Sequence, residues 1–135
     1  GIAWGALGAA KACYEAVVSY ARERVAFGAP IAAKQLVQEK IVEMAMEIAK
    51  GQIMALHYAR IKDTTGLTPV QVSLCKKNNV GVALRVARAA CGILGGNGIL
   101  LDYPVIRHML NLESVSTYEG TDEVQQMVIA RALGA

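Results

Sequence analysis

The chain has 135 residues, enough for one domain with its own core, and 54% of them are hydrophobic against 19% that are charged. Its net charge of +3 comes from lysines and arginines scattered among acidic residues, which argues against a nucleic-acid-binding surface. No segment offers the ~18 consecutive apolar residues that a membrane span needs, so we expect the apolar excess to be buried against another domain or subunit.

Apolar residues recur at steps of three and four along most of the chain, which predicts helices. The first helix covers about residues 2 to 24, and Gly28 and Pro30 stop it. The second helix begins near Ala32, and residues 63 to 69 (DTTGLTP) form a loop by composition.

The second half starts with a helix over about residues 70 to 94, followed by a glycine-rich turn, LGGNG, at 94 to 98. A shorter helix over about 103 to 112 and a last helix over about 121 to 133 complete the chain. No stretch alternates polar and β-branched residues, so we predict no strands. Long helices joined by short loops predict an all-α fold, an up-and-down four-helix bundle, forming a single domain over residues 1 to 135.

The cysteines and histidines do not form a metal-binding pattern. Cys13, Cys75 and Cys91 are far apart and have no CxxC spacing, which favours reduced thiols over a disulfide framework or a zinc site. His57 and His108 lie far apart in the sequence, and neither has a carboxylate at a spacing typical of metal ligands. We therefore predict no metal site.

The segment RVAFG, Arg24 to Gly28, allows two interpretations. In the structural one, Arg24 is a cation at a helix C-terminus, Phe27 packs under the turn, and Gly28 stops the helix. In the functional one, the forked and permanently charged head of Arg24 is presented to phosphate oxygens.

The LGGNG turn is equally ambiguous by itself. It follows a helix rather than a strand and lacks a third glycine, so it is not a dinucleotide-binding fingerprint. It can simply stop a helix and turn the chain. Alternatively, glycines there allow backbone N–H groups to approach a ligand closely.

The segment TYEGT, residues 117 to 121, offers two competing helix caps. Ser116 and Glu119 have the spacing of a capping box. Thr121, followed by two acidic residues, is also a good N-cap for the last helix. If Thr121 is the cap, Glu119 lies outside regular structure, and its carboxylate is a candidate general base.

These motifs together resemble a known family. RxxFG at 24 to 28, a glutamine at Gln35, LGGNG at 94 to 98 and YEGT at 118 to 121 occur in the order and spacing of the carboxy-terminal helical domain of acyl-CoA dehydrogenases. The resemblance spans essentially the whole chain. The opening GIAWGALGA, the phrase KNN at 77 to 79 and the segment from Tyr103 to Thr121 are most similar to glutaryl-CoA dehydrogenases.

The resemblance implies an FAD-dependent enzyme that removes two hydrogens from an acyl-CoA thioester. Glu119 matches the base that takes the α-proton while the β-hydride passes to flavin N5. The backbone N–H of Glu119 would also hydrogen-bond the thioester oxygen, which stabilises the developing enolate. Tyr118 would form part of the substrate pocket wall, and Gly120 would leave room for substrate.

The same resemblance implies contacts with FAD, often with the cofactor of a neighbouring subunit in a dimer or tetramer. The matching positions are Arg24, Phe27, Gln35, Gly92, Ile93, Leu94, Gly95, Gly96 and Thr121. Three positions depart from the family pattern: Gly92 replaces a longer polar residue, Glu123 replaces a common glutamine, and Lys34 replaces a histidine or asparagine. At Gly92 and Glu123, backbone contacts to FAD remain expected, whereas side-chain contacts are not.

The leading hypothesis is thus a glutaryl-CoA-type acyl-CoA dehydrogenase that passes electrons to an electron-transfer flavoprotein, in a bacterial cytoplasm or a mitochondrial matrix. An acyl-CoA oxidase on the same scaffold and a non-catalytic helical assembly domain are the alternatives. Because the chain starts without Met and within a helical pattern, we expect it to be a fragment of a longer polypeptide. Without the family's other domains, we expect the fragment alone to be inactive.

Overall fold

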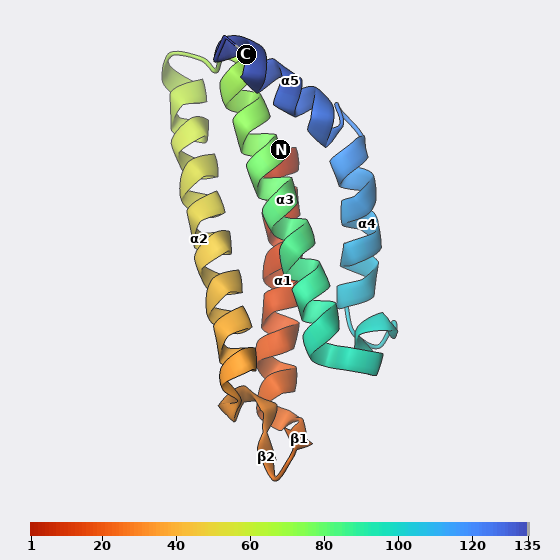
Figure 1. Ribbon diagram of the computed structural model, residues 1–135. Coiled ribbons are helices and arrows are strands. Elements are labelled where there is room, and N and C mark those ends of the chain that lie inside the picture. The colour runs from red at the N-terminus through yellow and green to blue at the C-terminus, as the bar shows by residue number, and fades with distance from the viewer. Residues whose placement is uncertain (135) are drawn as a thin grey trace.

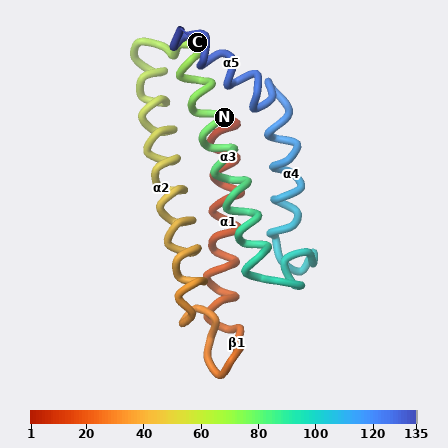
Figure 2. The backbone as a smooth tube through the Cα atoms, viewed as in Figure 1, coloured from red at the N-terminus to blue at the C-terminus, as the bar shows by residue number. Residues whose placement is uncertain are grey.

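The computed structural model describes residues 1–134, and most of them are helical (Figure 1). The elements in chain order are α1 (Ile2–Glu23), β1 (Val25–Ala26), β2 (Ala29–Pro30), the 3₁₀ helix η1 (Ile31–Ala33), α2 (Gln35–Thr64), α3 (Pro69–Leu94), the 3₁₀ helix η2 (Gly95–Ile99), α4 (Val105–Thr117) and α5 (Asp122–Ala132). Successive helices from α1 to α4 reverse direction, and α5 crosses one end of the bundle (Figure 2). The prediction of an all-α, up-and-down bundle is confirmed.

Helices α1 and α3 form the centre of the bundle. They pack against each other, and each also packs against α2 and α4. The largest fully buried apolar side chains come from these central helices and from α4; they are Leu7, Cys13, Val17, Val82, Val105 and Leu112. Within residues 1–134, none of the helices combines the length and the apolar character that a membrane span requires.

The prediction of no strands is wrong at one place, between α1 and α2. Val25 and Ala26 pair antiparallel with Pro30 and Ala29, so that a short hairpin projects from one end of the bundle (Figure 1). Its two loop residues, at positions 27 and 28, both have positive φ, of 54° and 77°. Two consecutive positive φ angles match the right-handed twist of a hairpin, which explains why a tight turn forms here.

Several helix boundaries also differ from the sequence prediction. α1 ends at Glu23, because the next residue, Arg24, is extended. α2 begins at Gln35, after the 3₁₀ turn, and continues through Thr64 into the predicted loop. α3 begins at Pro69, where Thr68 and Gln71 form a capping box and a proline at the first helical position needs no N–H partner.

A buried polar contact fixes α2 against α3. The Nδ2 group of Asn79 donates to the carbonyl of Gly51 at 3.2 Å, and Asn79 is completely buried. A Cβ atom on Gly51 would lie 2.9 Å from Asn79 Oδ1 and 2.9 Å from Leu7 Cδ2. A larger residue at position 51 would therefore force the buried side chains of Asn79 and Leu7 to shift.

We therefore expect Gly51→Ala to destabilise the domain by about 1–3 kcal/mol, because the added methyl overpacks this contact. Gly81→Ala is the matched control: it also adds a methyl to a helix, but its nearest neighbour would be Arg85 Nη1 at an ordinary 3.5 Å. Gly81→Ala should leave stability unchanged or raise it by up to about 1 kcal/mol through helix propensity. Thermal unfolding of the intact polypeptide compares the two; equal losses in both variants would contradict this account.

Candidate active site

The junction between α4 and α5 holds its backbone in an unusual conformation. α4 ends at Thr117, and α5 begins at Asp122 with Thr121 as its N-cap, whose Oγ1 accepts the N–H of Val124 at 3.3 Å. The Thr121 alternative for the cap is confirmed. The capping box with Ser116 is wrong, because Ser116 lies within α4 and its hydroxyl donates to the carbonyl of residue 113 at 2.7 Å.

Between the two helices, Glu119 and Gly120 have φ angles of 52° and 88°. A glutamate with positive φ is strained by roughly 1–3 kcal/mol, which persists only where the surroundings enforce it. The carboxylate of Glu119 is exposed and has no capping role. We call residues 118 to 120 the Glu119 turn.

Two side chains from outside the turn hold its carbonyl groups. The ammonium of Lys76, from α3, donates to the carbonyls of Tyr118 and Gly120. The Nε2 group of Gln125, from α5, donates to the carbonyls of Glu119 and Gly120 at 3.1 and 3.2 Å. All three carbonyls of the turn are therefore occupied by donors, which explains how the strained conformation is maintained.

Lys76 is buried, with 7% of its surface exposed, although it carries a cationic head. Burial lowers the pKa of Lys76, while the negative charges of Glu119 and Asp122 oppose that shift. Its neighbour Lys77 is more exposed and forms an ion pair with Asp122 at the start of α5. The two adjacent lysines thus have different roles: one holds the turn, and the other pairs at the surface.

Glu119 faces an open pocket of about 490 Å³ between α1, the end of α2, the start of α3 and the α4–α5 junction. Its lining combines apolar and polar side chains from these elements, including Ile2, Trp4, Ala55, Tyr58, Ala59, Lys62, Asp63, Leu67, Val72, Cys75, Lys76, Glu119 and Gln125. An exposed carboxylate at the edge of a largely apolar pocket can take a proton from a bound carbon acid. The side chain of Tyr118 is 45% exposed beside it.

At the other end of the bundle, a second open cleft of about 460 Å³ contains several predicted ligand-binding residues. Its lining consists of Tyr20, Arg24, Ile31, Ile93, Leu94, Gly95, Gly96 and Asn97. Asn97 Nδ2 donates to the hydroxyl of Tyr20 at 3.0 Å, so the 3₁₀ turn η2 is fixed to α1. This contact brings the glycine turn beside Arg24, whose guanidinium is exposed and suited to an anionic ligand.

The glycines around η2 have different structural requirements. A Cβ on Gly98 would lie 2.9 Å from the Cα of Cys91 and even closer to its carbonyl oxygen. Gly95 has φ 60° and ψ −132°, a conformation that side chains disfavour. Among residues 1–134, a Cβ on Gly92 or Gly96 would meet no atom within 4 Å apart from its own neighbours along the chain, so packing within this range does not require glycine at either position. Their open surfaces leave room for a ligand.

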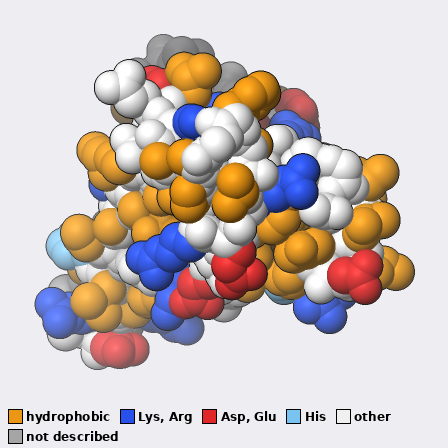
Figure 3. Space-filling model, turned by 90° about the horizontal axis from the view of Figure 1, so that it is seen from below, with side chains coloured by type: hydrophobic (Ala, Val, Ile, Leu, Met, Phe, Trp, Pro, Cys, Tyr) orange, Lys and Arg blue, Asp and Glu red, His pale blue; other side chains and the backbone are white. Residues whose placement is uncertain are grey.

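The structural interpretation of RVAFG, in which Phe27 packs under its turn, is wrong. Phe27 lies at the tip of the hairpin with 96% of its surface exposed and a φ of 54°. Gln35, the first residue of α2, is also exposed near this end. Seen from below, exposed hydrophobic side chains lie between positive and negative ones (Figure 3). The exposed ring of Phe27 is available for contact with another molecule.

The predicted residues thus form two groups at opposite ends of the bundle (Figure 1). Lys76, beside the Glu119 turn, and Leu94, beside the glycine turn, are 18 residue steps apart along α3, which corresponds to about 27 Å at 1.5 Å per step. Thr121 belongs to the Glu119 end. The sequence motifs assigned all of these residues to the same predicted function, but within a single chain they do not lie in one site.

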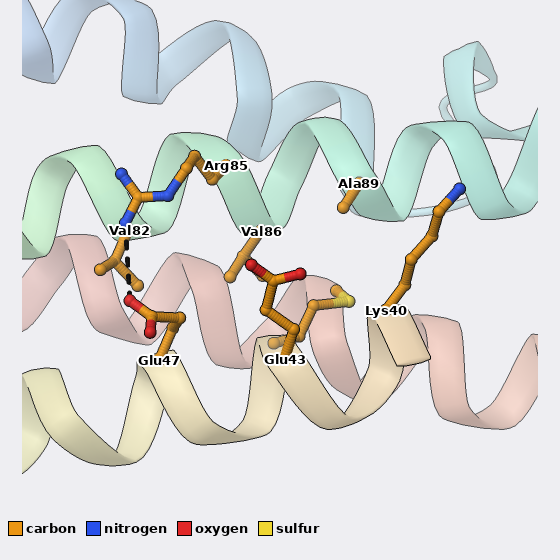
Figure 4. Close-up of a pocket in the computed structure, with 8 residues that line it drawn as sticks. Lys40, Glu43, Glu47, Val82, Arg85, Val86 and Ala89 are labelled. Atoms are coloured by element: carbon orange, nitrogen blue, oxygen red, sulfur yellow. Dashed lines mark ion pairs between the residues drawn. The ribbon is translucent and has the colours of Figure 1, made fainter. Parts of the chain in front are cut away.

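A third hollow, between α2 and α3, is smaller and has a structural explanation. It measures about 90 Å³ and is lined by Lys40, Glu43, Met44, Glu47, Val82, Arg85, Val86 and Ala89 (Figure 4). Arg85 Nη2 lies 3.5 Å from Glu47 Oε2. The hydrogen bond from Lys50, together with Arg85, lowers the pKa of Glu47. This hollow is bridged by an ion pair on the bundle surface and contains no predicted site residue.

Comparison with known proteins agrees with the motifs. A family model described as the acyl-CoA dehydrogenase C-terminal domain matches residues 1–134. The chain belongs to the acyl-CoA dehydrogenase family. Its fold is therefore the carboxy-terminal helical domain of that family, as the sequence motifs predicted.

Solved structures of the family superpose closely on this domain. A glutaryl-CoA dehydrogenase from Mycobacterium smegmatis is 50% identical, with a TM-score of 0.96 over 98% of this chain and 34% of the other. A glutaryl-CoA dehydrogenase from the same organism, in complex with FADH2, is 47% identical with a TM-score of 0.97 over the same shares. An acyl-CoA dehydrogenase from Bacillus subtilis is 36% identical over 133 residues. The chain spans about a third of each relative's length; for the Bacillus protein, the share is 35%.

The sequence interpretation missed the two residues that hold the Glu119 turn, Lys76 and Gln125. A signal for Lys76 was available: it lies four and seven residues before Val80 and Ala83, which are both buried, so it shares their helix face. A lysine on a buried face needs polar partners. The sequence could not identify them, because they lie more than 40 residues further along the chain.

Proposed function

We propose that this domain supplies the catalytic base of an FAD-dependent acyl-CoA dehydrogenase of the glutaryl-CoA type. The proposal rests on one observation above all: the YEGT motif places Glu119 in a strained turn, with its carboxylate exposed at an apolar pocket and without a structural role. The 50% identity to a glutaryl-CoA dehydrogenase supports the substrate class. Since the chain spans about a third of its relatives, the activity belongs to the whole polypeptide.

In this proposal, the carboxylate of Glu119 removes a proton from the carbon next to the thioester. Bound FAD supplies the acceptor, flavin N5, for the hydride that leaves the β-carbon. The side chain of Glu119 is exposed in the domain by itself, so its shielding from water must come from substrate, cofactor and the rest of the polypeptide. Burial in such a cover makes a carboxylate a stronger base.

The backbone of the same turn supports the second half of the mechanism. Within residues 1–134, the N–H of Glu119 donates to no acceptor. A free N–H beside the base can donate to the thioester oxygen and stabilise the negative charge that develops there. Gly120 keeps the adjacent surface open, and Tyr118 borders it.

The cleft at the hairpin end fits a phosphate-containing cofactor. In its lining, Arg24 offers a permanent cation and Gly96 a surface without a side chain. Gly92, near the end of α3, is also open but does not line the cleft. Phe27 offers an exposed aromatic face, and Gln35 lies at the start of the next helix. These residues would hold FAD together with Ile93, Leu94 and Gly95, whereas Thr121 would contact flavin at the other end.

The separation of the two groups supports an oligomer. A cofactor beside Glu119 of one subunit is far from the hairpin of the same subunit, so the hairpin would reach the cofactor of a neighbouring subunit. We propose a dimer or tetramer, with an electron-transfer flavoprotein as the electron acceptor. Location in a bacterial cytoplasm or a mitochondrial matrix stays a prediction.

The test uses the intact polypeptide under anaerobic conditions, as it is purified and without added cofactor. We expect its visible spectrum to contain an oxidised flavin band that glutaryl-CoA bleaches faster and more completely than butyryl-CoA does. A protein without flavin would contradict the whole proposal. If butyryl-CoA but not glutaryl-CoA bleached the flavin, the assignment as an acyl-CoA dehydrogenase would stand and the assignment of glutaryl-CoA as substrate would be wrong. Rapid reoxidation of the bleached protein by oxygen would instead favour the oxidase alternative.

A further inference from the structure

We propose that Lys76 is a positioning residue that orients and polarises the Glu119 N–H, the donor to the thioester oxygen. It acts through the Tyr118–Glu119 peptide group. This inference rests on the proposed function, because it assigns Lys76 a part in the same enolate-forming step. No motif of the sequence indicated it.

The geometry of one peptide group carries the argument. Lys76 Nζ is hydrogen-bonded to the carbonyl oxygen of Tyr118. The chain contains no cis peptide bond among the described residues, and in a planar trans peptide the C=O and the following N–H point in opposite directions. By holding the Tyr118 oxygen on the α3 side, Lys76 directs the N–H of Glu119 away from α3, where it meets no acceptor of the described chain.

A second bond fixes the other side of Glu119. Lys76 Nζ also donates to the carbonyl of Gly120, so one ammonium spans the residues before and after the base. The peptide before Glu119 cannot rotate without breaking the bond of Lys76 to the Tyr118 carbonyl, and the peptide after it is held at the Glu119 carbonyl by Gln125. Lys76 and Gln125 together therefore hold Glu119 in its left-handed conformation, and Lys76 sets the direction of its N–H.

Besides orienting the Glu119 N–H, Lys76 acts on it through its positive charge. A cation bound to a carbonyl oxygen withdraws electrons from the peptide, which makes the N–H of the same group a stronger donor. Lys76 is 7% exposed, so solvent screens this effect less than it would at a fully exposed lysine. The charged groups that face it are Glu119 and Asp122, and the ring of Tyr118 lies 5.9 Å from its nitrogen.

Turn stability alone does not require a buried cation here. Gln125 already provides neutral donors to the carbonyls of Glu119 and Gly120. Burying an ammonium costs more free energy than burying an amide. A charge-assisted bond is about twice as strong as a neutral one, and its effect on the peptide is the gain that the proposed reaction would use.

The experiment measures enolate formation without hydride transfer. Acetoacetyl-CoA is a β-keto thioester with an acidic α-proton and no hydrogen on its β-carbon, so the intact flavoprotein can bind it as an enolate but cannot oxidise it. The ultraviolet absorption of the bound enolate gives the ratio of enolate to keto form. Wild type, Lys76→Met, Lys76→Arg and Lys77→Met are compared, with the dissociation constant of coenzyme A measured for each.

We expect Lys76→Met to lower the enolate-to-keto ratio about 10- to 100-fold, below the roughly 10²–10³-fold cost of losing an oxyanion donor entirely. Coenzyme A should bind as in wild type. Lys76→Arg, which keeps a buried cation and its donors, should restore most of the ratio. Lys77→Met removes the adjacent lysine and its pair with Asp122, and its ratio should stay within about two-fold of wild type.

A Lys76→Met ratio equal to that of Lys77→Met would overturn the inference, and so would equal losses in Lys76→Met and Lys76→Arg. If Lys76→Met fails to retain flavin, Lys76→Gln takes its place, because a neutral donor can hold the turn without polarising it; a wild-type ratio in Lys76→Gln would then reject the role of the charge. If wild type contains no flavin, the proposed function fails and this inference fails with it. If wild type bleaches with substrate as proposed, a negative result concerns Lys76 alone.

Discussion

Glu119→Gln in the intact polypeptide is expected to slow flavin bleaching by its acyl-CoA substrate at least about 10²-fold, the lower end of what a general base contributes. The amide has the shape of the carboxylate but cannot accept the α-proton. The backbone N–H at position 119 remains, so binding of the thioester should change much less than the rate. Stopped-flow absorbance of the flavin band measures the rate constant at saturating substrate.

The matched control for this variant is Glu113→Gln. Glu113 lies on α4, six residues before Glu119, and pairs with Arg88 at the surface. Its loss removes the same charge from the same region without touching the turn, and we expect a rate within about two-fold of wild type. Equal rates in the Glu119→Gln variant and wild type, with normal flavin content in both, would remove Glu119 as the base.

Gly98→Ala is expected to destabilise the domain by about 3 kcal/mol or more, at the upper end of overpacking costs. The new methyl would collide with the backbone of Cys91, and backbone yields less readily than a flexible side chain. Gly96→Ala adds the same methyl two residues earlier, where no part of the described structure apart from the adjacent residues lies within 4 Å. We expect it to leave unfolding unchanged but to weaken FAD retention about ten-fold.

This pair of variants separates a glycine that packing requires from one that a ligand requires. Thermal unfolding of the apoprotein and the flavin content after dialysis are the two measurements. Loss of flavin without loss of stability in Gly96→Ala would support the cofactor cleft beside η2. Normal flavin retention in that variant would move the cofactor contact away from Gly96, whereas a stable Gly98→Ala variant would contradict the close contact with Cys91.

Local features of this protein could be predicted from the sequence because they depend on neighbouring residues. The spacing of Leu7, Val17 and other apolar side chains predicted the helices and their buried faces. Thr121 before two acidic residues predicted the start of α5. The hairpin was missed, because it contains only four paired residues and its turn consists of Phe27 and Gly28, which is not a common hairpin dipeptide.

The candidate site divides in the same way. The sequence by itself indicated the family and proposed Glu119 as a candidate base together with a set of candidate cofactor contacts, since four short motifs occur in a fixed order. Only the tertiary structure decided that these residues form two groups at opposite ends of the bundle, and that Gly96 faces open space whereas Gly98 packs against Cys91. It also decided that Lys76 holds a turn 42 residues away. The physical reason is that helix packing, rather than local hydrogen bonding, determines which distant segments meet.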